Sequence, residues 1–360
     1  MRVLFSLLDA QVGGGQRVAL QVAGELRERG HILGVVAPAP GPASDAFEDL
    51  GDAFHRANIG SLRGAADVTL VTRAMRGYDA LYSHTSLPGE ILGDAAATIT
   101  KRSHVIHQHT VARVSPTILV GAAHRMLYRA TFARRPIIAV APHVRKAVLT
   151  LGARPSMVEV VPNGVDLDEL RRASEGSATT EGVRVGMLAR FDPQKGIEVF
   201  LEAASLLMQT EAAFSIGASG TAYPQHEDRV RSAARVLGVE VVDPGNDGAS
   251  YLAGLDIVVL PSLGAEGAPL TLLEAMGLGK PVVASNVEGI GTMPGVAASA
   301  RLVPAGDAIA LGREIRSLID DGKARELLGE RALSLVRSLY DAHETARASA
   351  DIVERSVTQV

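Results

Sequence analysis

The chain has 360 residues, of which 47% are hydrophobic and 21% charged, a globular composition that excludes a disordered protein. It contains no Cys, which excludes disulfides, thiolate catalysis and Cys-ligated zinc or iron–sulfur clusters. The 36 Lys and Arg against 40 Asp and Glu give a net charge of −4. Aromatic residues make up only 4%, with no Trp, which argues against base-stacking platforms for single-stranded nucleic acid, and we expect no nucleic-acid partner.

The length favours two domains. No apolar run approaches the roughly 18 residues of a membrane-spanning helix, and the first residues lack the pattern of a signal peptide. We therefore expect a cytoplasmic protein, and the Ala-, Arg- and Gly-rich composition suggests a bacterial source.

The first half of the chain alternates β-branched runs with helical patterns. A helix is expected over residues 16–29, because Val18, Val22 and Leu26 fall on one stripe and Gly30 follows as a stop. Strands are expected at residues 2–7, 32–37, 80–83, 104–108, 137–140 and 158–161. Such a series predicts a parallel sheet covered on both faces.

The pattern weakens at residues 170–182, a polar stretch that we interpret as an interdomain linker, and then restarts. Strands are expected at residues 183–188, 213–217, 240–242, 256–260 and 281–284, and helices at residues 195–208, 307–320, 324–339 and 343–355. The predicted fold class is therefore α/β, with two doubly wound parallel-sheet domains.

Ligands of open α/β sheets bind outside the carboxyl ends of the strands. Four unusual segments directly follow predicted strands: the triplet Gly13, Gly14 and Gly15; His109; Arg190 with Lys195; and the loop around Glu266. Two of these segments come from each domain. If the two sheets face each other, all four line one cleft.

The glycine triplet precedes a helix, and a helix N-terminus with close backbone approach suits a phosphate. Its spacing matches neither GxGxxG nor a Walker A sequence, which argues against a NAD enzyme, and a tight turn explains it equally well. Arg190 and Lys195, at a strand end and a helix start, could clamp a diphosphate, although a lone Arg or Lys is usually a surface cation.

Glu266 lies in a Gly-rich loop and Glu274 in the second turn of the helix that follows it, with seven residues between them. Carboxylates at such places are good acceptors for sugar or ribose hydroxyls. A lone Glu is usually on a solvated helix face, but the neighbours of Glu274 are mostly apolar, which favours a defined partner.

Five segments, in this order along nearly the whole chain, resemble the retaining glycosyltransferases of family 4, which have the GT-B fold. The strongest are the Glu-x7-Glu segment, continued as LLEAMGLGKPVVAS, and ARFDPQKGIEVFLEAASLL. The weaker segments are VPNGVDLDEL, YLAGLDIVVLPS, and GGG followed by a helix that ends in RERGH.

The resemblance implies two Rossmann-like domains that face each other across a cleft. Residues 1–168 would form the acceptor side, residues 169–340 would hold the nucleotide-sugar donor, and the C-terminal helix at 341–360 would pack back on the first domain. Three positions depart from the family pattern: Gln16 stands where an acidic residue is common, Pro269 where Gly is common, and residues 286–295 follow the usual glycine-rich loop only loosely.

The resemblance also implies a role for each site residue that matches the family pattern by position. Arg190 and Lys195 would hold the donor diphosphate, and Glu274 would accept from the ribose hydroxyls. The transferred sugar would be held by Glu266 and by the backbone of Gly267, Ala268, Pro269 and Leu270. The glycines of the first domain would approach the phosphates or the acceptor. His109 would lie near the sugar, with His107 as its rival; either could instead be a core histidine.

No metal site is expected, because Asp166 and Asp168, the one Asp-x-Asp pair we considered, fall at a helix start and suit capping. A transferase without a metal must stabilise the departing diphosphate with cations and helix N-termini. We therefore expect no cofactor. The resemblance implies retention through a front-face mechanism, in which a leaving-phosphate oxygen takes the acceptor proton.

Residues 95–158 contain no Asp or Glu but ten Lys and Arg and five His. The cations are Lys101, Arg102, Arg113, Arg125, Arg129, Arg134, Arg135, Arg145, Lys146 and Arg154. Three interpretations remain open: a solvated face, attraction of an anionic or lipid-linked acceptor, and peripheral docking on an anionic membrane through a basic helix at residues 125–135.

The sequence thus favours metal-independent transfer of a sugar from a nucleoside diphosphate sugar to a hydroxyl, with a UDP-sugar favoured and GDP-mannose as the second choice. A nucleotide-sugar epimerase of related fold is one alternative, and a non-catalytic nucleotide-sugar-binding subunit is another. The family-4 segments argue against the first, and the retained site residues argue against the second.

Overall fold

The structure is a computed structural model that describes residues 1–10, 13–49, 53–58, 65–111, 117–175, 182–218, 220, 223–245 and 247–358. The chain forms two compact units. The first comprises Met1–Asn163 and His343–Val360, and the second comprises Gly164–Ala342.

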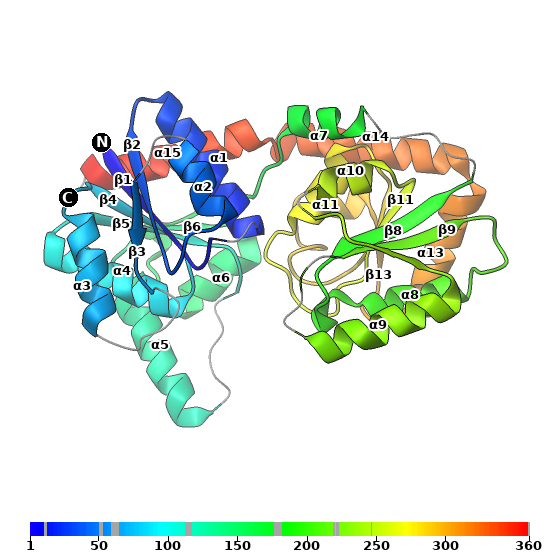
Figure 1. Cartoon of the computed structure of the whole chain (residues 1–360), viewed down its shortest axis with the longest axis horizontal. Helices are drawn as coiled ribbons and strands as arrows, with labels where there is room; N and C mark the ends of the chain where they lie inside the picture. Colours follow the sequence, from blue (N-terminus) through cyan, green and yellow to red (C-terminus); the bar gives the residue numbers. More distant parts are fainter. Residues whose placement is uncertain are drawn as a thin grey trace. The chain divides into compact units, whose positions relative to one another are not determined.

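The first unit is built on a seven-stranded sheet with the order β3-β2-β1-β4-β5-β6-β7 (Figure 1), and its strands all pair in parallel. The strands are β1 (Arg2–Leu7), β2 (Ile32–Ala37), β3 (Ala53–Arg56), β4 (Ala80–His84), β5 (Ser103–Gln108), β6 (Ile137–Ala139) and β7 (Val158–Val160). The helices are α1 (Gly14–Glu28), α2 (Pro42–Asp49), α3 (Ala65–Met75), α4 (Leu87–Thr100), α5 (Ile118–Phe132), α6 (Pro142–Thr150), the 3-10 helix η1 (Pro155–Met157) and α15 (Ala342–Thr358).

The second unit repeats this design with a six-stranded parallel sheet in the order β10-β9-β8-β11-β12-β13. The strands are β8 (Arg184–Ala189), β9 (Ala213–Ala218), β10 (Glu240–Val242), β11 (Ile257–Leu260), β12 (Val282–Ser285) and β13 (Arg301–Val303). The helices are α7 (Leu167–Ser174), η2 (Pro193–Lys195), α8 (Ile197–Ser205), α9 (Pro224–Leu237), α10 (Gly248–Ala253), α11 (Leu270–Gly277), α12 (Val296–Ser299), α13 (Ala308–Asp320) and α14 (Gly322–Leu339).

The C-terminal helix α15 belongs to the core of the first unit. Its Ala350 and Val353 are fully buried in the same cluster as Phe5 of β1. At the rim, Arg29 forms ion pairs with Asp351 (2.6 Å) and Glu354 of α15. Apolar burial therefore holds this helix against the first sheet, and the ion pairs fix its register.

The predicted α/β class with two doubly wound parallel sheets is confirmed, whereas the strands β3 and β13 were not predicted. Both are short and only partly buried, so neither shows a run of β-branched residues. Among the described residues, no helix combines the length and the apolar character that crossing a bilayer demands.

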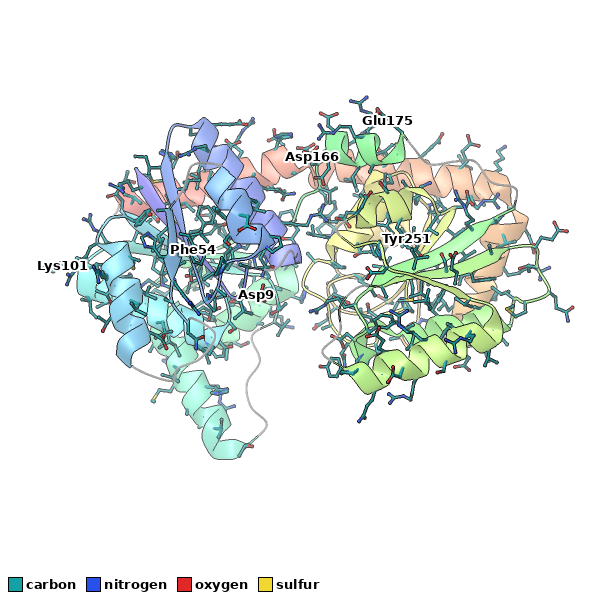
Figure 2. The ribbon with its side chains drawn as sticks, in the orientation of Figure 1. Asp9, Phe54, Lys101, Asp166, Glu175 and Tyr251 are labelled. Carbon is teal, nitrogen blue, oxygen red and sulfur yellow. The ribbon has the colours of Figure 1, made fainter. Side chains whose placement is uncertain are left out.

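The predicted linker at residues 170–182 is wrong over its first part, because α7 continues to Ser174. Leu170 buries all but 2% of its surface, and the Asp166 side chain caps the helix by accepting from the N–H groups of Asp168 and Glu169. Figure 2 labels Asp166 and Glu175 at the two ends of this helix. Residues 176–181 of the predicted linker lie outside the described residues.

Candidate active site

In the second unit, the predicted cations lie at the carboxyl ends of the strands. Arg190 directly follows β8 and is exposed, whereas Lys195 ends η2 and is half-buried. Asp192 is engaged in local structure, since its side chain accepts a hydrogen bond from the Gln194 N–H (2.9 Å) and caps η2. The two cations of this segment are Arg190 and Lys195, and the carboxylate of Asp192 is held in the local turn.

Lys195 and Glu266 form the central contact of this sheet edge. The ammonium Nζ lies 2.8 Å from Oε1 and 3.0 Å from Oε2 of Glu266, and the Ser262 hydroxyl donates to Oε1 over 2.7 Å. Only 27% of the Lys195 side chain and 16% of the Glu266 side chain are exposed. Three side chains from two loops are thus held in one polar cluster.

Two glycines allow these loops to approach so closely. Gly196 has a φ of +67°, and a Cβ built on it would lie 2.0 Å from the Pro261 carbonyl oxygen. Gly289 has a φ of +85°, and a Cβ there would lie 1.9 Å from the Glu266 carbonyl oxygen. The Glu266 N–H also donates to the Glu288 carbonyl (2.8 Å), so residues 286–295 brace the Glu266 loop.

Glu274 occupies the second turn of α11, as predicted, and only 3% of it is exposed. Gly267, Ala268 and Pro269 lead into this helix, and Leu270 is its first residue. A carboxylate buried in so apolar a helix requires polar partners, which distinguishes Glu274 from a solvated surface glutamate.

In the first unit, α1 begins two residues before the predicted start at residue 16, so that Gly13 is its N-cap and Gly14 its first residue. Gly15 lies against His109, since a Cβ built on it would come within 3.3 Å of His109 Cδ2. Two of the predicted segments are therefore in direct contact at the carboxyl edge of the first sheet.

Three histidine rings gather at this edge. His84 ends β4, His107 lies in β5, and His109 follows β5. The rings of His107 and His109 stack, with centroids 4.4 Å apart and 10° between their planes. Nδ1 of His84 lies 2.8 Å from Nε2 of His109, and the Tyr82 hydroxyl lies 2.5 Å from Nδ1 of His107.

Burial keeps these rings neutral. It is the main reason that the pKa values of His84 and His107 lie well below the usual range, with the neighbouring imidazoles adding to the effect. Burial also lowers the pKa of His109 to about 4. At neutral pH the first sheet therefore presents uncharged rings, each with one donor and one acceptor nitrogen.

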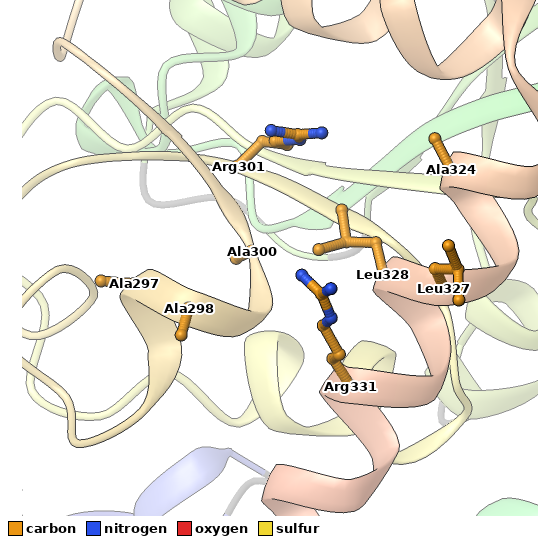
Figure 3. A pocket seen from close by; sticks show the side chains of 8 residues that line it. All are labelled: Ala297, Ala298, Ala300, Arg301, Ala324, Leu327, Leu328 and Arg331. Atoms are coloured by element: carbon orange, nitrogen blue, oxygen red, sulfur yellow. The ribbon is translucent and has the colours of Figure 1, made fainter.

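The described residues of the second unit line two hollows that bear on the site. One of 370 Å³ adjoins the Lys195 segment, because Pro193 of η2 lines it together with residues of α9 and its N-cap. The other, of 260 Å³, lies between α14 and the α12–β13 segment, with Arg301 and Arg331 at its rim (Figure 3). Arg301 begins β13, so the second hollow lies at the opposite sheet edge from Arg190.

Ser262 and His84 were not predicted as site residues, although both stand at predicted strand ends, where the strand-end rule applies equally. Gly196 and Gly289 were not predicted either, because their importance depends on backbone contacts between distant loops. Of the predicted basic segment, Arg113 lies outside the described residues, and Arg134 and Arg135 are ion-paired with Asp94.

Comparison with known proteins identifies the family of the chain. Residues 182–321 match the family described as glycosyl transferases group 1, and residues 12–169 match Glycosyltransferase Family 4. The chain is 31% identical over 294 residues to a phosphatidyl-myo-inositol mannosyltransferase of Mycobacterium tuberculosis, covering 77% of this chain and 75% of that protein. It is 26% identical over 306 residues to an Escherichia coli UDP-Gal:alpha-D-GlcNAc-diphosphoundecaprenol alpha-1,3-galactosyltransferase, covering 77% of each.

Solved structures show the same fold. Anabaena HepE in complex with UDP-glucose superposes with a TM-score of 0.83 at 20% identity over 100% of both chains. The sucrose-phosphate synthase of Thermosynechococcus elongatus gives 0.80 at 16% identity, again over 100% of both chains. The fold, the two matched segments and the similarity to curated transferases agree: the chain belongs to the family-4 glycosyltransferases and is an enzyme with the GT-B fold.

Proposed function

We propose that the enzyme transfers a sugar from a nucleoside diphosphate sugar to a hydroxyl acceptor, with retention of anomeric configuration and without a metal ion. A UDP-sugar is the favoured donor and GDP-mannose the alternative. The observation that carries the proposal is the Lys195–Glu266–Ser262 cluster, at the sheet edge where Arg190 also follows β8 and where ligands of this fold bind.

In this proposal, Arg190 and Lys195 bind the diphosphate. A guanidinium offers paired N–H donors that match phosphate oxygens, and an ammonium offers a compact point charge. The charge on the bridging oxygen grows as the bond to the anomeric carbon breaks, so fixed cations stabilise the transition state more than the ground state. The contact with Glu266 holds the Lys195 ammonium in place beforehand.

Glu266 and the start of α11 bind the transferred sugar in this proposal. The Glu266 carboxylate accepts from sugar hydroxyls, and the helix start presents N–H groups to oxygens of the ligand. Pro269 has no N–H, so the backbone donors of this segment are Gly267, Ala268 and Leu270. Glu274 accepts from the ribose hydroxyls, which a buried carboxylate does more selectively than an exposed one.

In this proposal, every bond change of the transfer is accounted for without a nucleophile from the enzyme. The bond from the anomeric carbon to the phosphate oxygen breaks, the acceptor oxygen attacks the same face of an oxocarbenium-like centre, and the acceptor proton passes to the leaving phosphate. His109 is assigned to a sugar hydroxyl rather than to proton abstraction. Its low pKa supports this role, because the ring stays neutral through the physiological range.

A lipid-linked acceptor fits the relatives and the first unit. The names of two similar enzymes specify a phosphatidylinositol and a diphosphoundecaprenol substrate. In this chain, Met126 of α5 is 67% exposed beside the exposed Arg125 and Arg129, and α5 extends beyond its sheet (Figure 1). We assign this apolar and basic surface to an anionic membrane that carries the acceptor.

The donor is tested by thermal shift against UDP, GDP, ADP and their common sugar conjugates, in buffer with EDTA. One nucleotide series should stabilise the protein, and product NMR with that donor and an acceptor should show retained configuration. Clean inversion, or binding that needs Mg²⁺, would contradict the proposal.

Membrane docking is tested by co-sedimentation with anionic and zwitterionic vesicles at low and high salt. Binding should require anionic lipid, fall with salt, and weaken when Arg125 and Arg129 are both changed to Gln. Equal behaviour with both vesicle types would remove the membrane assignment but leave the donor assignment standing.

A further inference from the structure

Lys195 contacts the carboxylate of Glu266, although the proposed function assigns its ammonium to the donor diphosphate. Nζ of Lys195 lies 2.8 Å from Oε1 and 3.0 Å from Oε2 of Glu266. An ammonium has three N–H donors and one charge, so two anions that approach it compete for both. A diphosphate that binds Lys195 must therefore weaken the contact of this residue with Glu266.

Weakening this contact is unfavourable for Glu266. Only 16% of its side chain is exposed, so water can replace the ammonium only in part. A carboxylate that is mostly buried needs hydrogen-bond donors from the protein, and an oxygen left without a donor there is costly. The carboxylate therefore needs a donor that stays in place while the ammonium turns to the diphosphate.

The hydroxyl of Ser262 meets this need. It donates to Oε1 of Glu266 over 2.7 Å, which is also the oxygen that the Lys195 ammonium approaches more closely. Ser262 is only 3% exposed. A neutral hydroxyl attracts a diphosphate far less than an ammonium does, because charge-assisted hydrogen bonds are the stronger ones. Ser262 can therefore keep its bond to Glu266 when an anion binds Lys195.

The backbone holds Ser262 in place independently of the carboxylate. The Leu263 N–H donates to the Gln194 carbonyl of η2 over 2.9 Å. On the other side of Ser262, the carbonyl of Pro261 packs directly against Gly196. Both neighbours of Ser262 are thus fixed against the η2 segment, which carries the ammonium. The hydroxyl therefore has a set position between that segment and the Glu266 loop.

We propose that Ser262 is a positioning residue: its hydroxyl anchors Oε1 of Glu266, so that the Lys195 ammonium can turn to a diphosphate while the carboxylate keeps its place. The inference rests on the proposed function for the identity of the ligand. The competing explanation is purely structural, with the hydroxyl only stabilising the loop that leads to Glu266. The two explanations differ in what they expect when the charge of Glu266 is removed.

The test is calorimetry in EDTA with whichever of UDP, GDP and inorganic pyrophosphate binds the wild type most tightly. Ser262→Ala makes Glu266 more dependent on Lys195, so this ligand should bind about tenfold more weakly, the scale of one hydrogen bond to a charged group. Ser262→Thr keeps a hydroxyl and should recover most of that loss. Ser299→Ala removes another buried serine of the second unit, in α12, and should bind the ligand as the wild type does.

A double-mutant cycle with Glu266→Gln separates positioning from structure. A neutral amide does not hold the ammonium, so adding Ser262→Ala to Glu266→Gln should change the affinity by less than about twofold. An equal loss in both backgrounds would overturn the proposal, because a loop defect acts whatever the charge at this position. An unchanged affinity in Ser262→Ala would overturn it too, as would a Ser262→Thr variant that is as impaired as Ser262→Ala.

Thermal unfolding shows which variants keep the fold. If Ser262→Ala does not fold, Ser262→Cys takes its place, because a thiol is of similar size but a weak donor, and the same loss is expected. Failure of the proposed function looks different. If none of the three ligands binds the wild type, the proposed function and the positioning role both fall. If the wild type binds and transfers, but the cycle shows no coupling, only the positioning role is overturned.

Discussion

The carboxyl ends of the first sheet hold uncharged rings, whereas those of the second sheet hold fixed charges. Both sheets are parallel and share one pattern of strand order, so the backbone supplies the same kind of ligand edge twice. In the first unit, burial lowers the pKa values of three histidines, so their rings are neutral. In the second, Lys195 and Glu266 remain partly exposed and paired, and Arg190 is open to solvent.

In the proposed function, this difference divides the work between the two units. Neutral rings discriminate hydroxyls by hydrogen bonding without attracting counter-ions, whereas fixed cations stabilise a charged leaving group. Each of the following experiments changes a residue in one of the two units. They are given from the largest expected effect to the smallest.

Removing a cation of the second sheet should have the largest effect. Arg190→Ala and Lys195→Ala should each lower kcat/KM by roughly 10²-fold or more, the scale of losing one donor to transition-state charge. Arg301→Ala, which removes an exposed arginine from the opposite edge of the same sheet, is the matched control and should be near normal. Near-normal rates for both site variants would refute their role.

Neutralising the buried carboxylate of α11 should have an intermediate effect. Glu274→Gln keeps the shape of the side chain but loses a charge-assisted hydrogen bond, which should weaken donor binding by about 10- to 100-fold. The informative comparison is between the nucleoside diphosphate and its 2′-deoxy and 3′-deoxy analogues. The wild type should discriminate against at least one of them, and the variant should not; unchanged discrimination would assign Glu274 to the core.

Crowding the first sheet should cost less. In Gly15→Ala the new Cβ would lie 3.3 Å from His109 Cδ2, so the ring must shift by a few tenths of an ångström. We expect a loss of about tenfold in kcat/KM, because small displacements of positioned groups are costly. Gly24→Ala on the same helix has no atom within 4 Å of the new Cβ and should keep full activity with slightly higher stability. Equal activity of both variants would contradict the Gly15 contact.

The smallest effect concerns stability and pH in the first unit. Burial raises the pKa of Glu90 from 4.5 to about 8, so the folded protein keeps a proton that the unfolded chain loses. The contribution of Glu90 to stability is therefore present below pH 4.5 and is lost as pH rises toward 8. Glu90→Gln removes this loss, so its Tm relative to the wild type should rise by about 4 °C or more between pH 5 and 8. A difference in Tm that does not change with pH would show that Glu90 does not titrate in this way.

The strand-end rule predicted most residues of the candidate site. Gly15, His109, Arg190, Lys195 and Glu266 all lie at the predicted sheet edges, because hydrophobic periodicity marks strand ends well. The contacts between loops could not be predicted from the sequence. The contact of Lys195 with Glu266 depends on the close approach of Gly196 to the carbonyl oxygen of Pro261, which lies 65 residues later in the chain. The hydrogen bond of His109 with His84 depends likewise on a ring from another strand.

At the predicted linker, the sequence contained a local helix signal that the prediction did not use. Polar composition at residues 170–182 predicted an irregular segment, yet one buried leucine and the Asp166 cap are enough to fold the first part as a helix. Average polarity hides such local signals, because a surface helix needs only a narrow apolar stripe.

The most direct test of the central claim compares the affinity of the nucleoside diphosphate selected by the donor screen with that of its nucleoside, by calorimetry in EDTA. The account predicts that the diphosphate binds far more tightly to the wild type, and that this advantage largely disappears in the Arg190→Ala/Lys195→Ala double variant. Equal affinities for the two ligands in the wild type, or diphosphate binding that appears only when Mg²⁺ is restored, would contradict it.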